Sequence, residues 1–146
     1  MPTFGFTGPR ALTPEQAIQA SYDLYEIDTH NEGATWHVGD ADGVDKLARE
    51  NCREGSLTEH NAEGRKPWQL QARSKRLVEA LAQAGGTLHA WPNKPAPADL
   101  KPDSWQGSGT WGTILYAHTL GVQVVLHPLA DFPAPVWLSQ EQMSLL

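Results

Sequence analysis

The order of apolar and polar positions predicts strands and helices that alternate along the whole chain. Short apolar runs predict five strands, over residues 3–6, 34–38, 57–60, 87–91 and 122–126. Between them, apolar residues spaced three and four apart predict four helices, which begin near residues 14, 44, 68 and 107. Such alternation implies right-handed crossovers, so we predict an α/β domain with a mostly parallel sheet that helices cover on both faces.

The first helix has the clearest start in the sequence. Residues 13–16 read Thr-Pro-Glu-Gln, which supplies a capping hydroxyl, a proline at the first helical position and a glutamine that can return the hydrogen bond to the cap. The apolar residues Ile18, Tyr22 and Tyr25 follow at spacings of four and three. We therefore predict that these three side chains form the inner face of the helix.

We divide the chain into a ligand-binding domain over residues 1–128 and a C-terminal tail over residues 129–146. The tail contains Pro133 and Pro135 and shows no regular period. We expect it to pack across the domain or against a partner subunit. Its apolar residues 136–138 would suit a homodimer.

Three glycine-bearing loops, at residues 7–10, 39–43 and 107–110, come after predicted strands. Parallel sheets bind ligands at the carboxyl ends of their strands, so we expect these loops to converge on one edge. Glycine lets backbone amides approach a phosphate closely, and a helix N-terminus favours an anion. A glycine turn before a helix can equally be structural. No P-loop and no dinucleotide-binding fingerprint is present in the sequence.

The net charge argues against nucleic acid as a partner. The 11 Lys and Arg against 17 Asp and Glu give a charge of −6, whereas non-specific binding to a phosphate backbone requires clustered cations. Residues 65–76 hold a local cluster of basic residues, which could attract an anion or could be a solvated helix face. We therefore expect a small-molecule partner and regard nucleic acid as unlikely.

The remaining composition predicts a cytoplasmic protein without a metal ion or cofactor. A lone cysteine, Cys52, excludes an intrachain disulfide and suits a reducing compartment. No apolar run approaches the ~20 residues that span a bilayer, so we expect no membrane partner. The residues His37, His89 and His127 do not have a metal-ligand spacing, and we expect them to be structural.

Several motifs of the chain, taken in order, resemble those of the SLOG superfamily. They are Gly-Phe-Thr-Gly-Pro-Arg at residues 5–10, His-Val-Gly-Asp-Ala-Asp-Gly-Val-Asp at 37–45, Arg73, and Ser-Gly-Thr at 108–110. The superfamily includes the cytokinin-activating LOG proteins, the DprA/Smf DNA-processing proteins and small nucleotide sensors. The resemblance covers about residues 3–127. It implies a Rossmann-like three-layer sandwich with a sheet of about five strands.

The resemblance also implies that a ligand with ribose and phosphate lies across the three loops. Arg73 matches the arginine that faces the ribose phosphate in LOG enzymes. Trp111 is our preferred residue for stacking on a base, with core packing as the alternative. The predicted ligand-binding residues are Thr7, Gly8, Arg10, Gly39, Asp40, Asp42, Gly43, Arg73, Gly107, Ser108, Gly109, Thr110 and Trp111.

One departure from the LOG pattern bears on activity. LOG enzymes have G-x-G-T-x-x-E, whose glutamate takes part in cleaving the bond between base and ribose, and this chain has Thr113 at that position. Threonine cannot act as a carboxylate acid or base. We therefore favour a binding protein that senses or sequesters a nucleotide-derived small molecule. The alternative is a LOG-like hydrolase that cleaves nucleoside 5′-monophosphates, in which Asp40, Asp42 or Asp45 replaces the glutamate unless these aspartates are only helix caps.

Overall fold

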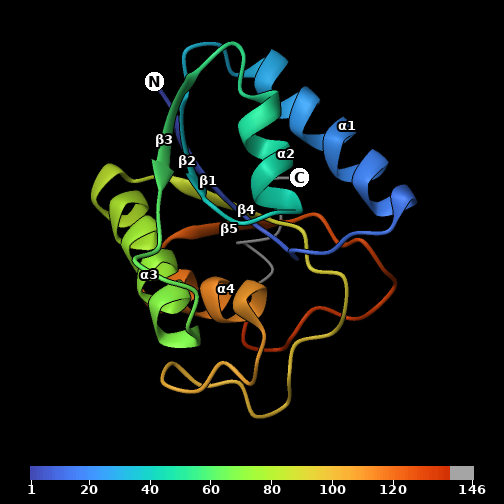
Figure 1. The fold of residues 1–146 in the computed structure, drawn as a ribbon, viewed down its shortest axis with the longest axis vertical. Coiled ribbons are helices and arrows are strands. Elements are labelled where there is room, and N and C mark those ends of the chain that lie inside the picture. Colours follow the sequence, from blue (N-terminus) through green and yellow to red (C-terminus); the bar gives the residue numbers. More distant parts are fainter. Residues whose placement is uncertain (139–146) are drawn as a thin grey trace.

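The computed structural model describes residues 1–138, in which five strands alternate with four helices (Figure 1). The last residues of the predicted tail, 139–146, lie outside the described residues. The elements are β1 (Thr3–Thr7), α1 (Pro14–His30), β2 (Thr35–Gly39), α2 (Val44–Asn51), β3 (Ser56–His60), α3 (Pro67–Ala84), β4 (Thr87–Ala90), α4 (Gly109–Thr119) and β5 (Gln123–Leu126).

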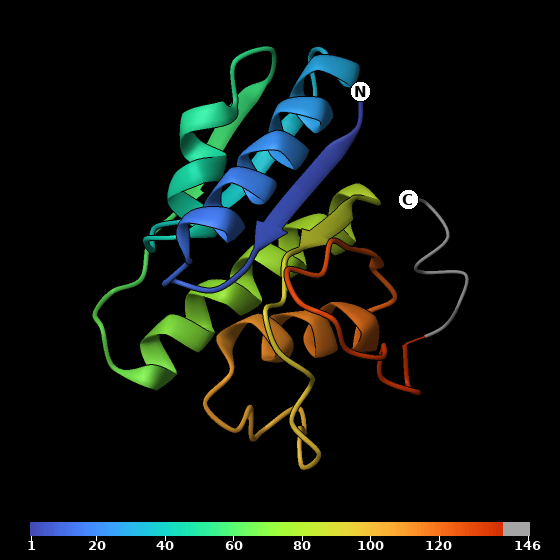
Figure 2. The same cartoon turned by 90° about the vertical axis from the view of Figure 1, so that its right-hand side faces the viewer.

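The strands form one parallel sheet in the order β3-β2-β1-β4-β5. From β1 the chain moves outward through β2 to β3, and α3 then carries it back to β4 on the other side of β1. Helices α1 and α2 cover one face of the sheet and α3 and α4 cover the other (Figure 2). The predicted Rossmann-like α/β fold is confirmed. Loops leave β1 and β4 toward opposite faces, which opens a crevice at their carboxyl ends.

Each face of the sheet has its own hydrophobic core. Phe6, Trp36 and Val38 are fully buried against α1 and α2, as expected for Trp36. On the other face, Leu88 of β4 packs in one cluster with Ile114 of α4. The core beside α1 and α2 is built on β1 and β2, and the core beside α3 and α4 is built on β4 and β5, whereas β3 at the edge contributes to neither.

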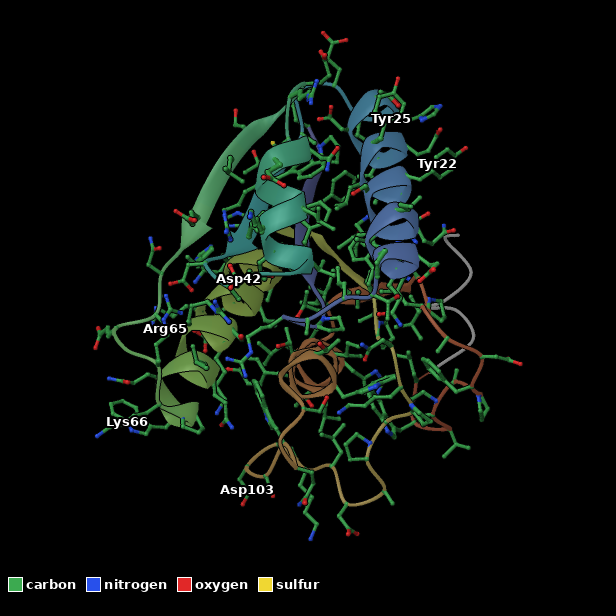
Figure 3. The ribbon with its side chains drawn as sticks, turned by 45° about the vertical axis from the view of Figure 1, so that its right-hand side comes forward. Tyr22, Tyr25, Asp42, Arg65, Lys66 and Asp103 are labelled. Carbon is green, nitrogen blue, oxygen red and sulfur yellow. The ribbon has the colours of Figure 1, made fainter. Side chains whose placement is uncertain are left out.

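The predicted inner face of α1 is wrong. Ile18, Tyr22 and Tyr25 are 71%, 61% and 57% exposed, and Figure 3 shows both tyrosines pointing away from the sheet. The helix instead buries Ala20 and Leu24. Both sets of residues recur at helical spacing, so periodicity alone could not select the buried one. The small Ala20 side chain lets the helix lie close to the sheet.

A buried aspartate also contributes to this inner face. Asp28 lies on it at 3% exposure, and its Oδ1 accepts hydrogen bonds from the backbone N–H groups of Arg53 and Glu54, at 3.1 and 3.0 Å. These bonds satisfy the carboxylate in its buried position. Asp28 thereby ties the end of α1 to the turn after α2.

The chain after β5 returns across the α3 and α4 face. Phe132, Ala134 and Trp137 pack against the core cluster of that face, and Leu138 is buried in it, whereas Val136 is fully exposed. The division of the chain at residue 128 stays a prediction, as does the homodimer. No described helix combines the length and the apolar character needed to cross a membrane.

Candidate functional site

A cleft of about 770 Å³ opens at the carboxyl edge of the sheet, where β1 and β4 end. Its walls come from the loop after β1, the start of α2, the first turns of α3, residues 92–94 and residues 105–111. This volume lies within the range of small-molecule and nucleotide sites. The three glycine-bearing loops therefore converge as expected.

Most of the predicted site residues line this cleft. They are Thr7, Gly8, Arg10, Asp42, Arg73, Gly107, Ser108, Gly109, Thr110 and Trp111. Gly39, Asp40 and Gly43 are not among the lining residues. That any of these residues contacts a ligand stays a prediction.

Two glycines fit the first two loops together. Gly43 has a φ of +67°, and a Cβ there would collide with the carbonyl oxygen of Pro9. The next residue, Val44, donates its N–H to that same oxygen at 3.2 Å, and a Cβ on Gly8 would collide with the Val44 side chain. Both glycines permit a close approach of the loops, which is a structural role.

Arg73 is held between two aspartates at the back of the cleft. Its Nη1 lies 2.6 Å from Asp40 Oδ1 and 3.7 Å from Asp45 Oδ2. Gly39 leaves room for this arrangement, because a Cβ there would come within 2.7 Å of Arg73 Nη1. Arg65 Nη2 contacts the other oxygen of Asp40 at 3.1 Å. Asp40 therefore positions two cations and does not itself face the cleft.

The two aspartates titrate in opposite directions. Burial raises the pKa of Asp40, but the backbone hydrogen bond from Ala62 and the charges of Arg73 and Arg65 outweigh it, so the pKa is lowered. Asp45 is more deeply buried, at 6% exposure. Its burial outweighs the nearby arginines and the hydrogen bond from Ala41, and raises its pKa to about 6. The carboxyl of Asp45, which lines the cleft, therefore changes charge close to neutral pH.

The amino end of α4 faces the cleft through a glycine turn. Ser108 is the N-cap, and its Oγ accepts a hydrogen bond from Trp111 N–H at 3.1 Å. Gly107 has a φ of +74°, and a Cβ on it or on Gly109 would meet open space. The first backbone N–H groups of the helix, including that of Thr110, point outward with the positive end of the helix dipole. The turn can accept an anion.

Two residues of α4 turn out to be structural. Trp111 is 1% exposed, its Nε1 donates to Lys94 O at 2.8 Å, and its ring packs edge-on against Phe132, which is the core alternative to base stacking. Thr113 is 2% exposed and donates its hydroxyl to Gly109 O at 2.7 Å. The position that holds the glutamate in LOG enzymes is thus occupied here by a buried threonine, whose hydroxyl already donates a hydrogen bond within the helix.

Sequence reasoning missed several residues of the cleft wall. Lys94 and Trp105 both line it, and both come from the long segment between β4 and α4. The segment is proline-rich and has no period, so only its unusual length signalled a function. Of the basic cluster at 65–76, Arg65 and Arg73 line the cleft, so part of the cluster is placed where it could attract an anion.

The histidines form two pairs between neighbouring strands. His37 Nδ1 and His60 Nε2 are 2.8 Å apart, and His89 Nδ1 and His127 Nε2 are 2.9 Å apart. Burial lowers the pKa of His89 to about 3, so that ring is neutral at physiological pH. Within residues 1–138, no group of three or more His, Cys, Asp or Glu side chains could hold a metal ion.

The fold defines a doubly wound α/β protein with a cleft at its topological switch point. Neither a family model nor a curated protein matches the chain. In structure, the chain is similar to DNA processing protein A from Helicobacter pylori, solved to explain its single-stranded DNA binding mode, with a TM-score of 0.60 and 13% identity. The match covers 86% of this chain and 64% of that chain, so it spans less than two thirds of the neighbour. It shows the fold, and membership of the SLOG superfamily stays a prediction.

One expectation is corrected by this comparison. We expected a nucleotide-derived small molecule as the partner and regarded nucleic acid as unlikely, but the structural neighbour binds single-stranded DNA. The net charge averages over the whole surface and does not describe the cleft. Arg10, Arg65, Arg73 and Lys94 all line the cleft despite the overall charge of −6.

Proposed function

We propose that this protein binds single-stranded nucleic acid, with nucleotides entering the cleft at the carboxyl edge of the sheet. The observation that carries the proposal is the convergence of four cationic side chains on one concave site: Arg10, Arg65, Arg73 and Lys94. Only two aspartates, Asp42 and Asp45, are among the residues lining the cleft. The fold similarity to a protein that binds single-stranded DNA supports the same conclusion.

The loops suit the phosphate groups of such a strand. The turn at 107–110 presents backbone N–H groups at the start of α4, and Arg10 and Lys94 are exposed on the flanking loops. Phosphate oxygens accept hydrogen bonds from backbone amides and charge-assisted bonds from arginine. The cleft therefore offers donors of both kinds.

The walls favour unpaired nucleotides over a duplex. Pro9, Leu70 and Trp105 contribute apolar surface to the cleft. Bases in a single strand can turn their faces toward such a surface, whereas a duplex keeps them stacked inside. Since the cleft holds about 770 Å³, we expect it to accommodate only a few nucleotides.

The test is fluorescence anisotropy with a labelled oligothymidylate at salt concentrations from about 50 to 200 mM. Each neutralised phosphate of a single strand lowers log K by about 0.7 per decade of salt, so four cations give a slope of at most about −3. We expect single strands, but not a duplex of the same length, to compete.

Arg10→Ala should weaken binding and make the salt slope shallower by about 0.7. Arg53→Ala removes the same charge from the turn after α2, away from the residues lining the cleft, and serves as the matched control. The proposal is wrong if the wild-type protein does not bind single strands at low salt, or if Arg53→Ala costs as much affinity as Arg10→Ala.

A further inference from the structure

Trp68 stands out among the tryptophans because its indole lies in water. Trp36, Trp91, Trp105 and Trp111 are all at most 3% exposed, whereas Trp68 is 62% exposed. Within residues 1–138 it contacts no other aromatic ring and its Nε1 donates no hydrogen bond. The fold does not need this indole for packing, so the large apolar surface is available to a partner.

Its place in α3 puts Trp68 at the rim of the cleft. Pro67 before it and Leu70 and Gln71 after it line the cleft. Lys75, two helical turns further on, lies on the same side of α3 as Trp68. The Lys75 ammonium lies 6.0 Å from the ring centroid of Trp105, which forms part of the cleft wall. Trp68 is not itself a lining residue, but it lies next to Pro67 on the side of α3 that carries Lys75, about 10 Å further out along the helix.

Two cations precede Trp68 in the chain. The Arg65 side chain is 65% exposed, lines the cleft and is held by Asp40, while Lys66 is exposed beside it (Figure 3). A single-stranded nucleic acid that leaves the cleft past α3 would bring its phosphates near these two side chains. The base between those phosphates would then lie within reach of the indole.

We propose that Trp68 is a stacking platform for a base of the nucleotide that lies next to those in the cleft. The inference rests on the proposed function and extends its site over the first turn of α3. Stacking of a base on an aromatic ring is tolerant of sequence, because every base has a flat π face. The platform adds affinity for single strands of any sequence. Because it needs a base whose face is free, it also makes binding favour unpaired nucleotides over a duplex.

Tryptophan emission provides a direct test in the wild-type protein. Since Trp68 is the most exposed of the six tryptophans, its emission dominates the solvent-sensitive part of the spectrum. Titration with an oligothymidylate should quench this emission, and an abasic strand of the same length should not. An unchanged spectrum at saturating oligothymidylate would refute the platform.

Variants give the energetic test. Trp68→Ala should weaken binding of the oligothymidylate by about 5- to 150-fold, the range that base stacking is worth, whereas Trp68→Phe should retain most of the affinity. On the abasic strand, Trp68→Ala and wild type should bind alike. Tyr22→Ala removes an equally exposed aromatic ring from α1, on the other face of the sheet, and should leave binding unchanged.

The outcomes separate this inference from the proposed function. If the wild-type protein binds no single strand, the proposed function fails. If it binds and Trp68→Ala binds equally tightly, only the platform fails and the cleft remains the site. Should Trp68→Ala not fold, the wild-type quenching and Trp68→Phe still decide the question.

Discussion

Replacing Asp45 by asparagine should stabilise the protein at neutral pH, although it removes an ion-pair partner of Arg73. The Asp45 carboxyl has a pKa of about 6 in the folded protein, against 3.8 for the free side chain, because burial penalises its charge. A carboxyl whose pKa is raised on folding binds its proton more tightly in the folded state. Its contribution to stability is therefore complete below about pH 4 and is lost as the pH rises through about 6.

The magnitude follows from the two pKa values. At about 1.4 kcal/mol for each pH unit, the gap between 3.8 and about 6 corresponds to about 3 kcal/mol of free energy of unfolding. Asparagine stays neutral and can still accept the hydrogen bond that Ala41 N–H makes at 3.2 Å. Arg73 loses a partner at 3.7 Å but keeps Asp40 at 2.6 Å. We expect Asp45→Asn to gain about 1–3 kcal/mol at pH 7.5 and nothing near pH 4.

Urea unfolding of both proteins at several pH values between 4 and 8 measures this difference. The Asp40 carboxyl is present in both, so its own pH dependence cancels. Asp42→Asn is the matched control, because it makes the same chemical change at an exposed carboxyl of the same loop, where substitutions usually alter stability little. Parallel curves for Asp45→Asn and wild type, or a less stable variant at pH 7.5, would show that the arginines fully compensate the buried charge, and would refute the reasoning.

Three further substitutions test the structure. His89→Phe should flatten the loss of stability as the pH falls from 6.5 toward 3, because burial holds the His89 pKa at about 3 and the unfolded chain takes up the proton first; equal acid sensitivity in urea titrations would contradict this. Gly112→Ala should cost about 1–3 kcal/mol and weaken binding, because its Cβ would collide with the Trp105 ring that forms the cleft wall; an unchanged thermal midpoint would contradict it. Thr113→Val should cost about 1 kcal/mol by removing the hydroxyl bond to Gly109 O, and Thr113→Glu should cost more without releasing free base from a nucleoside monophosphate; a hydrolytic Thr113→Glu protein would revive the LOG-like alternative.

The order of elements could be predicted because each strand carries its own signal. In the strand over Gln123–Leu126 the last three residues are apolar and buried, and its one neighbour in the sheet, β4, is buried in the same pattern. The buried face of α1 could not be predicted from the apolar pattern in the same way. Residues 18, 22 and 25 and residues 20, 24 and 28 both recur at helical spacing, and only the packing of Ala20 against the sheet selects the second set.

The candidate site was predictable to the extent that topology alone determines it. Parallel strands bring the loops that follow them to one edge, so the glycine-bearing loops could be placed together from their order. The pairing of Arg73 with Asp40 was not predictable, because the two residues are 33 positions apart and meet only when α3 packs beside β2. Trp111 illustrates the converse, since its position at a helix start suited a ligand but its ring fills the core.

The negative net charge and the cationic cleft are compatible because screening limits the reach of each charge. At physiological ionic strength, charges more than about 8 Å apart are largely screened. A phosphate in the cleft therefore responds to Arg10, Arg65 and Lys94 and little to acidic residues on distant surfaces. A long nucleic-acid strand that ran beyond the cleft would meet a surface on which acidic residues outnumber basic ones. The charge distribution thus favours contact over a few nucleotides.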